Sequence, residues 1–169
     1  MPNENDHFLA AWEKEAQLTI KLLRALPKNS YEYRPDKEGR SLGEMAWHLA
    51  ELEAYMTYGI EKGEVGPGLK PPGIERPLTI EELAAGYERI HREAVERVRK
   101  LRPEDYPRMI PFFDGSQVRV HDILWGSVLH HLIHHRGQLT LLCRMAGGTT
   151  PRIYGPSRED TMAMRHAAS

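Results

Sequence analysis

Hydrophobic residues recur at intervals of three and four along most of the chain, a spacing that places them on one face of an α-helix. The first such stretch spans about residues 6–26 and ends at Pro27, because proline breaks the interior of a helix. The second begins at Ser41-Leu-Gly-Glu44, a capping box in which the hydroxyl and the carboxylate bind backbone N–H groups reciprocally. It ends near Gly63. The pattern predicts two long helices in this part of the chain.

Two further helices are predicted beyond a segment that is rich in helix breakers. Residues 63–78 contain four prolines and four glycines, a composition that no helix or central strand tolerates. Thr79-Ile-Glu-Glu82 has the form of a second capping box and opens a helix to about residue 101. The last long helix spans about residues 121–145 and stops at a Gly-Gly pair.

The element pattern as a whole predicts an all-α fold, a four-helix bundle. Strand pairing is expected only around Asp114-Gly115, a pair that forms tight turns. The long second and third connections permit an up-down-down-up order as well as a simple up-down order. We expect a single domain over residues 1–169, with a core at about 6–146 and a tail at 147–169. The tail carries one short helix capped by Ser157, and its segment 151–156 packs over the bundle end or reaches a partner subunit.

The composition excludes several classes of protein. Lys and Arg number 23 against 24 Asp and Glu, and this balance argues against binding to a nucleic-acid duplex. The single cysteine, Cys143, excludes an internal disulfide framework and is expected to be an inert core thiol. No apolar run approaches the roughly 20 residues of a membrane span, and the polar first residues do not resemble a secretory signal. We therefore expect a cytoplasmic protein with no nucleic-acid or membrane partner.

Histidine is the most distinctive feature of the sequence. The chain has nine, four of them between residues 130 and 135. At about 100° per residue, His131 and His135 share the direction of the apolar stripe, whereas His130 and His134 are turned about 100° from it. On the second helix, His48 lies at the border of the apolar stripe. The others are expected at segment ends or on polar faces: His7, His91, His121 and His166.

The inward pair predicts a metal site. Burying unpartnered imidazoles costs about 1–3 kcal/mol per group, and a divalent ion bound by both rings removes that cost. His48 would supply a third ligand from a neighbouring helix, although a lone histidine is more often packed or solvated. The motif is not that of an HExxH metalloprotease, because Leu132 follows His131 and the glutamate general base is missing.

Several neighbours of these histidines are weaker candidates. Gln138 could bond a ligand or a metal-bound water, or tie helices together as a buried amide. Tyr55 could line the mouth of a pocket, and Gln138 and Tyr55 are the candidates for cofactor binding. Glu44 and Glu51 flank His48, so either could orient its imidazole or belong to a solvated face. Two further predictions for the last helix are a salt bridge at Arg136 and a close helix contact or tight site at Gly137.

Ser41-Leu-Gly-Glu-Met-Ala-Trp-His48-Leu, together with His131-X3-His135-Arg-Gly-Gln138, resembles the DinB/YfiT-like superfamily over about residues 6–146. The resemblance implies a four-helix bundle, often a homodimer, with a divalent metal held by three histidines. Carried over residue by residue, the ligands would be His48, His131 and His135, the same three that the helix faces select.

The resemblance also implies a chemistry. Three neutral nitrogen ligands leave an open coordination position, and imidazole suits zinc, nickel, iron or copper, of which zinc or nickel is expected. Characterised relatives look like thiol-dependent transferases and isomerases, in which the metal activates a low-molecular-weight thiol such as bacillithiol or mycothiol.

Three functions remain open at this point. The first is a metal-dependent transferase acting on a thiol and a small electrophilic substrate, with no side chain assigned as catalytic. The second is a metal-binding protein without turnover, used in stress-related sequestration or sensing. The third is a helical protein whose metal only stabilises the fold, and a fourth protein ligand such as His134 or Glu51 would favour it.

Overall fold

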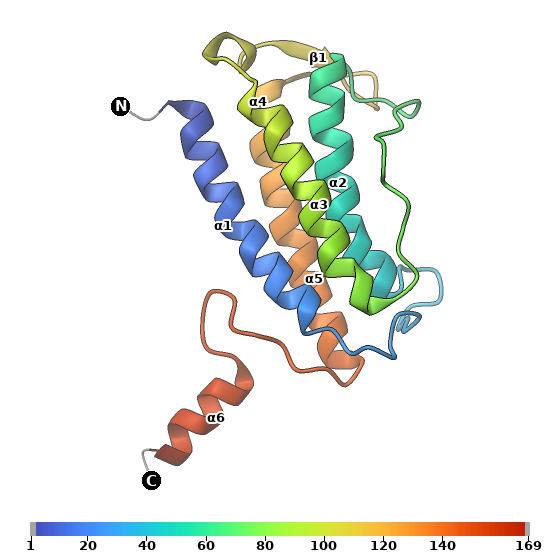
Figure 1. The fold of residues 1–169 in the computed structure, drawn as a ribbon, viewed down its shortest axis with the longest axis vertical. Helices are drawn as coiled ribbons and strands as arrows, with labels where there is room; N and C mark the ends of the chain where they lie inside the picture. Colours follow the sequence, from blue (N-terminus) through green and yellow to red (C-terminus); the bar gives the residue numbers. More distant parts are fainter. Residues whose placement is uncertain (1–2, 168–169) are drawn as a thin grey trace.

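Four long helical segments lie side by side in the computed structural model, which describes residues 3–167 (Figure 1). They are α1 (Glu4–Arg24), α2 (Leu42–Lys62), α3 (Ile80–Arg99) and a continuous helix made of α4 (Val120–Asp122), η2 (Ile123–His130) and α5 (His131–Met145). The mostly helical class is confirmed, and the arrangement is consistent with the predicted bundle.

The two predicted capping boxes have different outcomes. Ser41 Oγ accepts a hydrogen bond from the Glu44 N–H at 3.2 Å, and Glu44 Oε2 accepts one from the Ser41 N–H at 2.8 Å. The other end of α2 is also as predicted, because Gly63 takes up the left-handed conformation with φ 86°. The box at the start of α3 is wrong: the Thr79 hydroxyl donates to the Glu82 carboxylate at 2.6 Å and caps no backbone group.

The helices follow the up-down-down-up order. In Figure 1, α1 and the α4–α5 helix run in one direction, and α2 and α3 run in the other. The breaker-rich segment 63–79 returns along the outside to make this possible, and Trp47 Nε1 donates to the Ile74 carbonyl at 3.0 Å to hold it. Gly86 allows α3 to approach α2 closely, because a Cβ there would lie 2.8 Å from the Trp47 ring.

A short hairpin joins α3 to the last helix. After the 3₁₀ turn η1 (Pro103–Asp105), β1 (Met109–Pro111) pairs antiparallel with β2 (Gln117–Arg119), and Ile110 lies opposite Val118. The predicted turn contains Gly115 with φ 83°. Within residues 3–167 this is the single sheet, as the sequence predicts.

The last helix contains a π-helical segment, η2, and this changes the face that it buries. A π turn holds more residues than an α turn, so the buried stripe moves forward by one position along the chain. His131 and His135 therefore lie at the edge of the stripe, facing α2, and the prediction that they face the core squarely is wrong. The buried positions of η2 and α5 are Ile123, Leu124, Val128, Leu129, Leu132, Arg136, Leu139 and Cys143.

A buried carboxylate joins three of the helices. Glu53 on α2 is fully buried and accepts hydrogen bonds from Trp12 Nε1 at 2.9 Å and the Tyr87 hydroxyl at 2.6 Å. His91 Nδ1 lies 2.8 Å from its other oxygen. The expectation that His91 lies on a polar face is therefore wrong, since only 5% of the residue is exposed.

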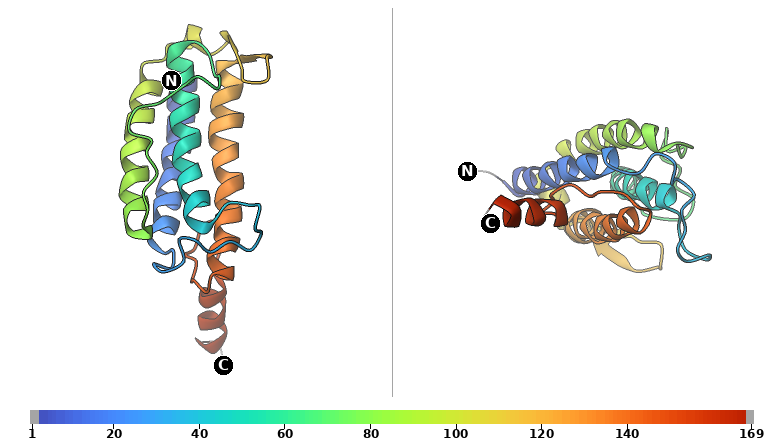
Figure 2. Two further views of the ribbon diagram at one scale, coloured as in Figure 1. Left: turned by 90° about the vertical axis from the view of Figure 1, so that its right-hand side faces the viewer. Right: turned by 90° about the horizontal axis from the view of Figure 1, so that it is seen from below.

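The C-terminal tail folds back before it leaves the body of the molecule. The Tyr154 hydroxyl contacts both Arg136 and Glu15 at 2.5 Å, over the ion pair that these two residues form. This confirms the predicted salt bridge at Arg136. The short helix α6 (Arg158–Ala167) then projects beyond the other helices (Figures 1 and 2). Ser157 caps it as predicted, because its hydroxyl accepts the Asp160 N–H at 3.1 Å.

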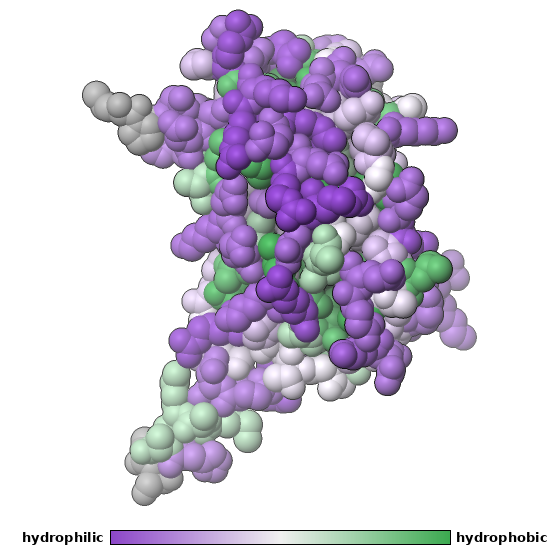
Figure 3. Space-filling model, viewed as in Figure 1, coloured by the Kyte–Doolittle hydropathy of each residue, from purple (hydrophilic) through white to green (hydrophobic). Residues whose placement is uncertain are grey.

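The surface over α1 and α3 is mostly hydrophilic, with scattered apolar patches (Figure 3). Within residues 3–167, each helix is too short or too polar to cross a bilayer.

Candidate metal centre

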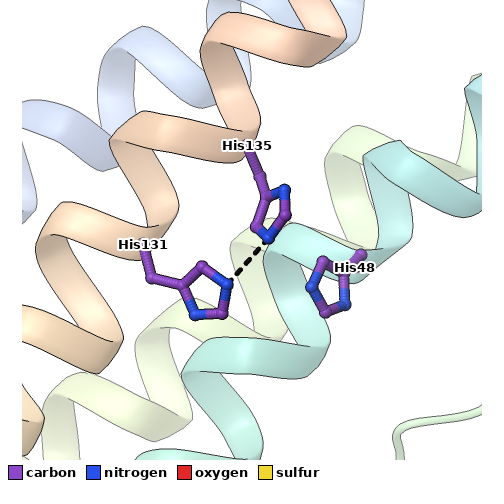
Figure 4. Close-up of side chains that lie close together, drawn as sticks. All are labelled: His48, His131 and His135. Carbon is purple, nitrogen blue, oxygen red and sulfur yellow. Dashed lines mark hydrogen bonds between the residues drawn. The ribbon is translucent and has the colours of Figure 1, made fainter.

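Three imidazole rings from two helices converge at one place beside the core (Figure 4). His48 comes from the second turn of α2, and His131 and His135 come from successive turns of α5. The ring of His48 lies 4.7 Å from that of His135 and 5.9 Å from that of His131, between centroids. One nitrogen of each ring lies within 4.8 Å of the others. The structure thus brings together the three residues that the sequence selects as ligands.

Two of the rings have an acceptor on the side away from the cluster. His135 Nδ1 lies 2.6 Å from Gln138 Oε1, and His48 Nδ1 lies 3.3 Å from Glu51 Oε2. Amide and carboxylate oxygens only accept, so Nδ1 of each ring carries the proton. Each neutral ring then presents the lone pair of Nε2, which is the atom a metal binds.

The inner nitrogens of the α5 pair are crowded. His131 Nε2 and His135 Nε2 lie 2.7 Å apart. A dashed line joins these two atoms in Figure 4. The ring of His131 also hydrogen-bonds to the backbone of Ser127, which places a ring proton there and partly offsets the lowering of its pKa by burial and by the charge of His48. Two lone pairs facing each other at this distance repel, and a cation between them removes the repulsion.

Burial keeps the α5 pair neutral. The pKa of His135 is lowered to about 4, first by burial and then by the charges of His48 and His131, while the hydrogen bond to Gln138 opposes the shift. Burial and the charge of His48 also lower the pKa of His131. Neutral imidazole is the form that binds a metal, so both rings are ready to bind one at neutral pH.

A cavity of about 270 Å³ opens beside the cluster. His48 and His131 form one side of it, and Tyr55 lies in its wall as predicted. Only 17% of the His48 side chain is exposed. The position of His131 and His135 at the edge of the core follows from the shift of the buried stripe in η2. If the two rings pointed straight into the core, they would be surrounded by packed side chains and would have no cavity beside them.

The neighbouring candidates divide into two groups. Gln138 and Glu51 contact ligand rings as expected, although Gln138 is exposed and is not a buried amide between helices. Glu44 does not orient His48, because its carboxylate caps α2 and pairs with Arg34 at 2.8 Å.

The prediction for Gly137 is also wrong, since a Cβ there would meet nothing within 4 Å. His130 and His134 are exposed and belong to no three-residue cluster among residues 3–167. Burial raises the pKa of the Cys143 thiol, as expected of an inert core cysteine.

The residues fit a divalent ion of the nitrogen-preferring kind. Bonds of about 2.0–2.1 Å to a tetrahedral ion would place ligand nitrogens about 3.4 Å apart. The 2.7 Å between His131 and His135 reaches that value with small side-chain rotations. Each of these two rings and His48 is also braced from behind, the pattern found around bound metals.

Comparison with known proteins shows the family of this chain. A sequence model of the DinB family matches residues 1–166. The chain belongs to the DinB family. It is 31% identical over 155 residues to the uncharacterized protein YrdA of Bacillus subtilis, an alignment that covers 92% of this chain and 90% of YrdA.

Solved DinB-like structures share the fold. A protein from Bacillus cereus matches with a TM-score of 0.72 and 28% identity, over 87% of this chain and 95% of that one. YjoA of Bacillus subtilis matches with a TM-score of 0.69 and 22% identity, over 90% of this chain and 99% of that one. At 22% identity, the similarity to YjoA supports only the fold of this DinB-family chain.

Arg40 is a residue of the site that the sequence pattern does not indicate. Arg40 lies in the wall of the same cavity, just before the first turn of α2. No periodicity indicates a loop residue of this kind, and its position follows from how the loop enters the capping box at Ser41.

Proposed function

We propose that this DinB-family protein holds one divalent metal ion through His48, His131 and His135 in a four-helix bundle and uses it to bind a small molecule. The observation that carries the proposal is the convergence of three imidazoles whose outer nitrogens are already hydrogen-bonded. Hydrogen bonds to the outer nitrogens fix the tautomer in which the inner nitrogen is free to bind a metal. Histidines that only face solvent do not need this.

The site is proposed to be open. Among residues 3–167, the cluster has three members, and neither suggested fourth ligand joins it. His134 is exposed, and Glu51 contacts the outer nitrogen of His48. When bound, an ion at such a site supplies a Lewis acid with a vacant position and lowers the pKa of a thiol or water that binds there. This supports a binding or catalytic role over a purely structural one.

The side chains around the cluster would then have two roles, to orient the ligand rings and to form the wall of the cavity. Glu51 and Gln138 hold the ligand rings in orientation, and Tyr55 and Leu52 form an apolar part of the cavity wall. The charged side chains of the cavity wall are Arg40 and Glu51, and Glu51 is engaged with His48. This scarcity of acid-base groups argues against hydrolysis and favours a reaction in which the ligand itself is the nucleophile.

We infer a thiol-dependent transferase-like activity on a small electrophile, with zinc or nickel as the expected ion. A homodimer stays a prediction from the family resemblance. The second candidate is a metal-binding protein without turnover, and the same scarcity of acid-base side chains favours it.

The test uses cobalt-substituted protein and small thiols. Thiolate binding at the open position produces a sulfur-to-cobalt charge-transfer band, and His48→Ala should abolish the band by removing one ligand. Cobalt binding without a band for any thiol would reject the thiol-dependent function and leave metal binding alone. Absence of cobalt binding would reject both candidates.

A further inference from the structure

A larger cavity adjoins the one beside the three histidines. The second cavity measures about 470 Å³ and lies against the loop that precedes α2. Arg40 and Glu51 line both cavities, so they stand where the two meet. A ligand bound next to the histidines therefore has Arg40 in the wall of the same cavity.

Arg40 differs from the other arginines in this region because its charge is not engaged. Arg34 and Arg76 both pair with Glu44, at 2.8 Å and 3.4 Å. Over the described range 3–167, no carboxylate lies within ion-pair distance of Arg40. Its positive charge is felt in the cluster, where it contributes to the lowered pKa of His131. A guanidinium in this position is available to a ligand.

The charge of the site favours an anionic ligand. Three neutral imidazoles leave the two positive charges of a divalent ion uncompensated, and the net charge of the site stays at two positive charges when Arg40 and Glu51, which do not form an ion pair, are added. A thiolate neutralises one charge of the ion. One positive charge then remains in the site, and a second negative group on the ligand would neutralise it. One guanidinium matches one carboxylate, because its fork of N–H donors binds both oxygens of that group.

We propose that Arg40 binds a carboxylate of the small molecule whose thiol end reaches the histidine cluster, so that the cavity selects carboxylate-bearing thiols over neutral ones. The inference rests on the proposed function, because it needs a thiol at the open position. Arg40 acts as a specificity residue: it touches the far end of the ligand and takes no part in holding the metal.

The experiment compares two thiols of similar length on the cobalt-substituted protein. The probes are 3-mercaptopropionate, which ends in a carboxylate, and 2-mercaptoethanol, which ends in a hydroxyl. Titration of the charge-transfer band yields a Kd for each, and the ratio of the two cancels differences in cobalt loading. We expect the wild-type protein to bind the carboxylate thiol about tenfold more tightly, as a charge-assisted bond predicts.

Two variants and a matched control locate the effect. Arg40→Gln should remove the preference and leave the Kd of 2-mercaptoethanol and the affinity for cobalt within about twofold. Arg40→Lys should keep part of it, because the charge remains but the fork is lost. Arg76→Gln is the control: Arg76 lines the second cavity, is paired with Glu44 and does not line the cavity at the histidines. It should keep the full preference.

Each result decides the matter. An unchanged Kd ratio in Arg40→Gln, or an equal loss in Arg76→Gln, overturns the role of Arg40 while the bands themselves sustain the proposed function. Equal binding of both thiols by the wild-type protein overturns the carboxylate preference. Absence of a band with either thiol rejects the proposed thiol function and this inference with it.

Discussion

Gln138 lies one helical turn beyond His135 on α5, and its Oε1 accepts a hydrogen bond from His135 Nδ1 at 2.6 Å. The bond places the ring proton on the outer nitrogen and leaves the lone pair of Nε2 in the cluster. An exposed glutamine thus sets the tautomer of a half-buried ligand ring.

Removing this acceptor should weaken metal binding. Gln138→Leu keeps the size of the side chain but frees the ring of His135 to take the other tautomer, and loss of such a bond costs about 10–100-fold in metal affinity. Competition with a zinc-binding dye measures the change. Gln17→Leu, at an exposed glutamine of α1, is the control and should have no effect. Equal affinities in the two variants would show that Gln138 does not support the site.

The two histidine pairs of the last helix should differ in metal content. Purified protein should carry about one divalent ion per chain, because three ligands converge at one place. His131→Ala with His135→Ala should remove it, whereas His130→Ala with His134→Ala should not, since that pair is exposed. Elemental analysis of the two double variants provides the comparison. Metal loss in the 130/134 variant alone would contradict the assignment.

Acid should destabilise the metal-free protein through His135. Burial lowers its pKa to about 4 in the folded chain, against about 6.5 in the unfolded chain. Between these values the unfolded state binds the extra proton, so the free energy of unfolding falls as the pH drops from about 6.5 to about 4. Urea denaturation at pH 7 and pH 4.5 should show a smaller loss for His135→Gln than for the wild type. An equal loss of unfolding free energy in the variant and the wild type would show that His135 is not the cause of the acid destabilisation.

His91 should titrate in the opposite sense. Burial alone would lower its pKa, but the charge and hydrogen bond of Glu53, aided by Glu13, outweigh burial and raise it. The stabilisation is present below the unfolded value of about 6.5 and is lost as the pH rises through the folded value. Ring-proton NMR should place the midpoint above 6.5, and Glu13→Gln should lower it. A midpoint below 6.5 would mean that burial dominates.

The ion pair beneath the tail should be costly to break from one side. Arg136 is 2% exposed, so Glu15→Gln leaves a buried guanidinium without its counter-charge and should cost about 3–5 kcal/mol in unfolding free energy. Tyr154→Phe removes one neutral hydroxyl from the same group and should cost about 1 kcal/mol. Urea denaturation separates the two. Similar small losses would indicate that water reaches Arg136 when the partner is removed.

The long helices and their ends could be predicted because they depend on local chemistry. The period of three and four, the Ser41–Glu44 box and the left-handed Gly63 all act within a few residues, so the sequence is sufficient for them. The second box fails because Thr79 has the same residue pattern but a hydroxyl turned to Glu82. A capping pattern specifies which groups are available and does not specify their rotamers.

The three histidines could also be selected from sequence, through helix phase and family resemblance, but their surroundings could not. A straight helix at 100° per residue places His131 and His135 on the core stripe, whereas the π-helical segment moves that stripe to Leu132 and Arg136. The insertion of one residue into a turn depends on how the helix packs against its neighbours, so the spacing of hydrophobic residues in the sequence does not predict it.

Alone, the sequence determined the helical class and the ends of α2, because both follow from contacts between residues close along the chain. The clustered histidines were selected from helix phase together with the family resemblance. Only the tertiary structure decided that the histidine cluster lies at the edge of the core beside a cavity and that Glu53 and His91 meet inside the core. It also decided that Arg40, which pairs with no carboxylate among residues 3–167, lines two neighbouring cavities. These relationships join helices and loops that are distant in sequence. Their energy comes from burial and charge, which exist only after the helices have packed.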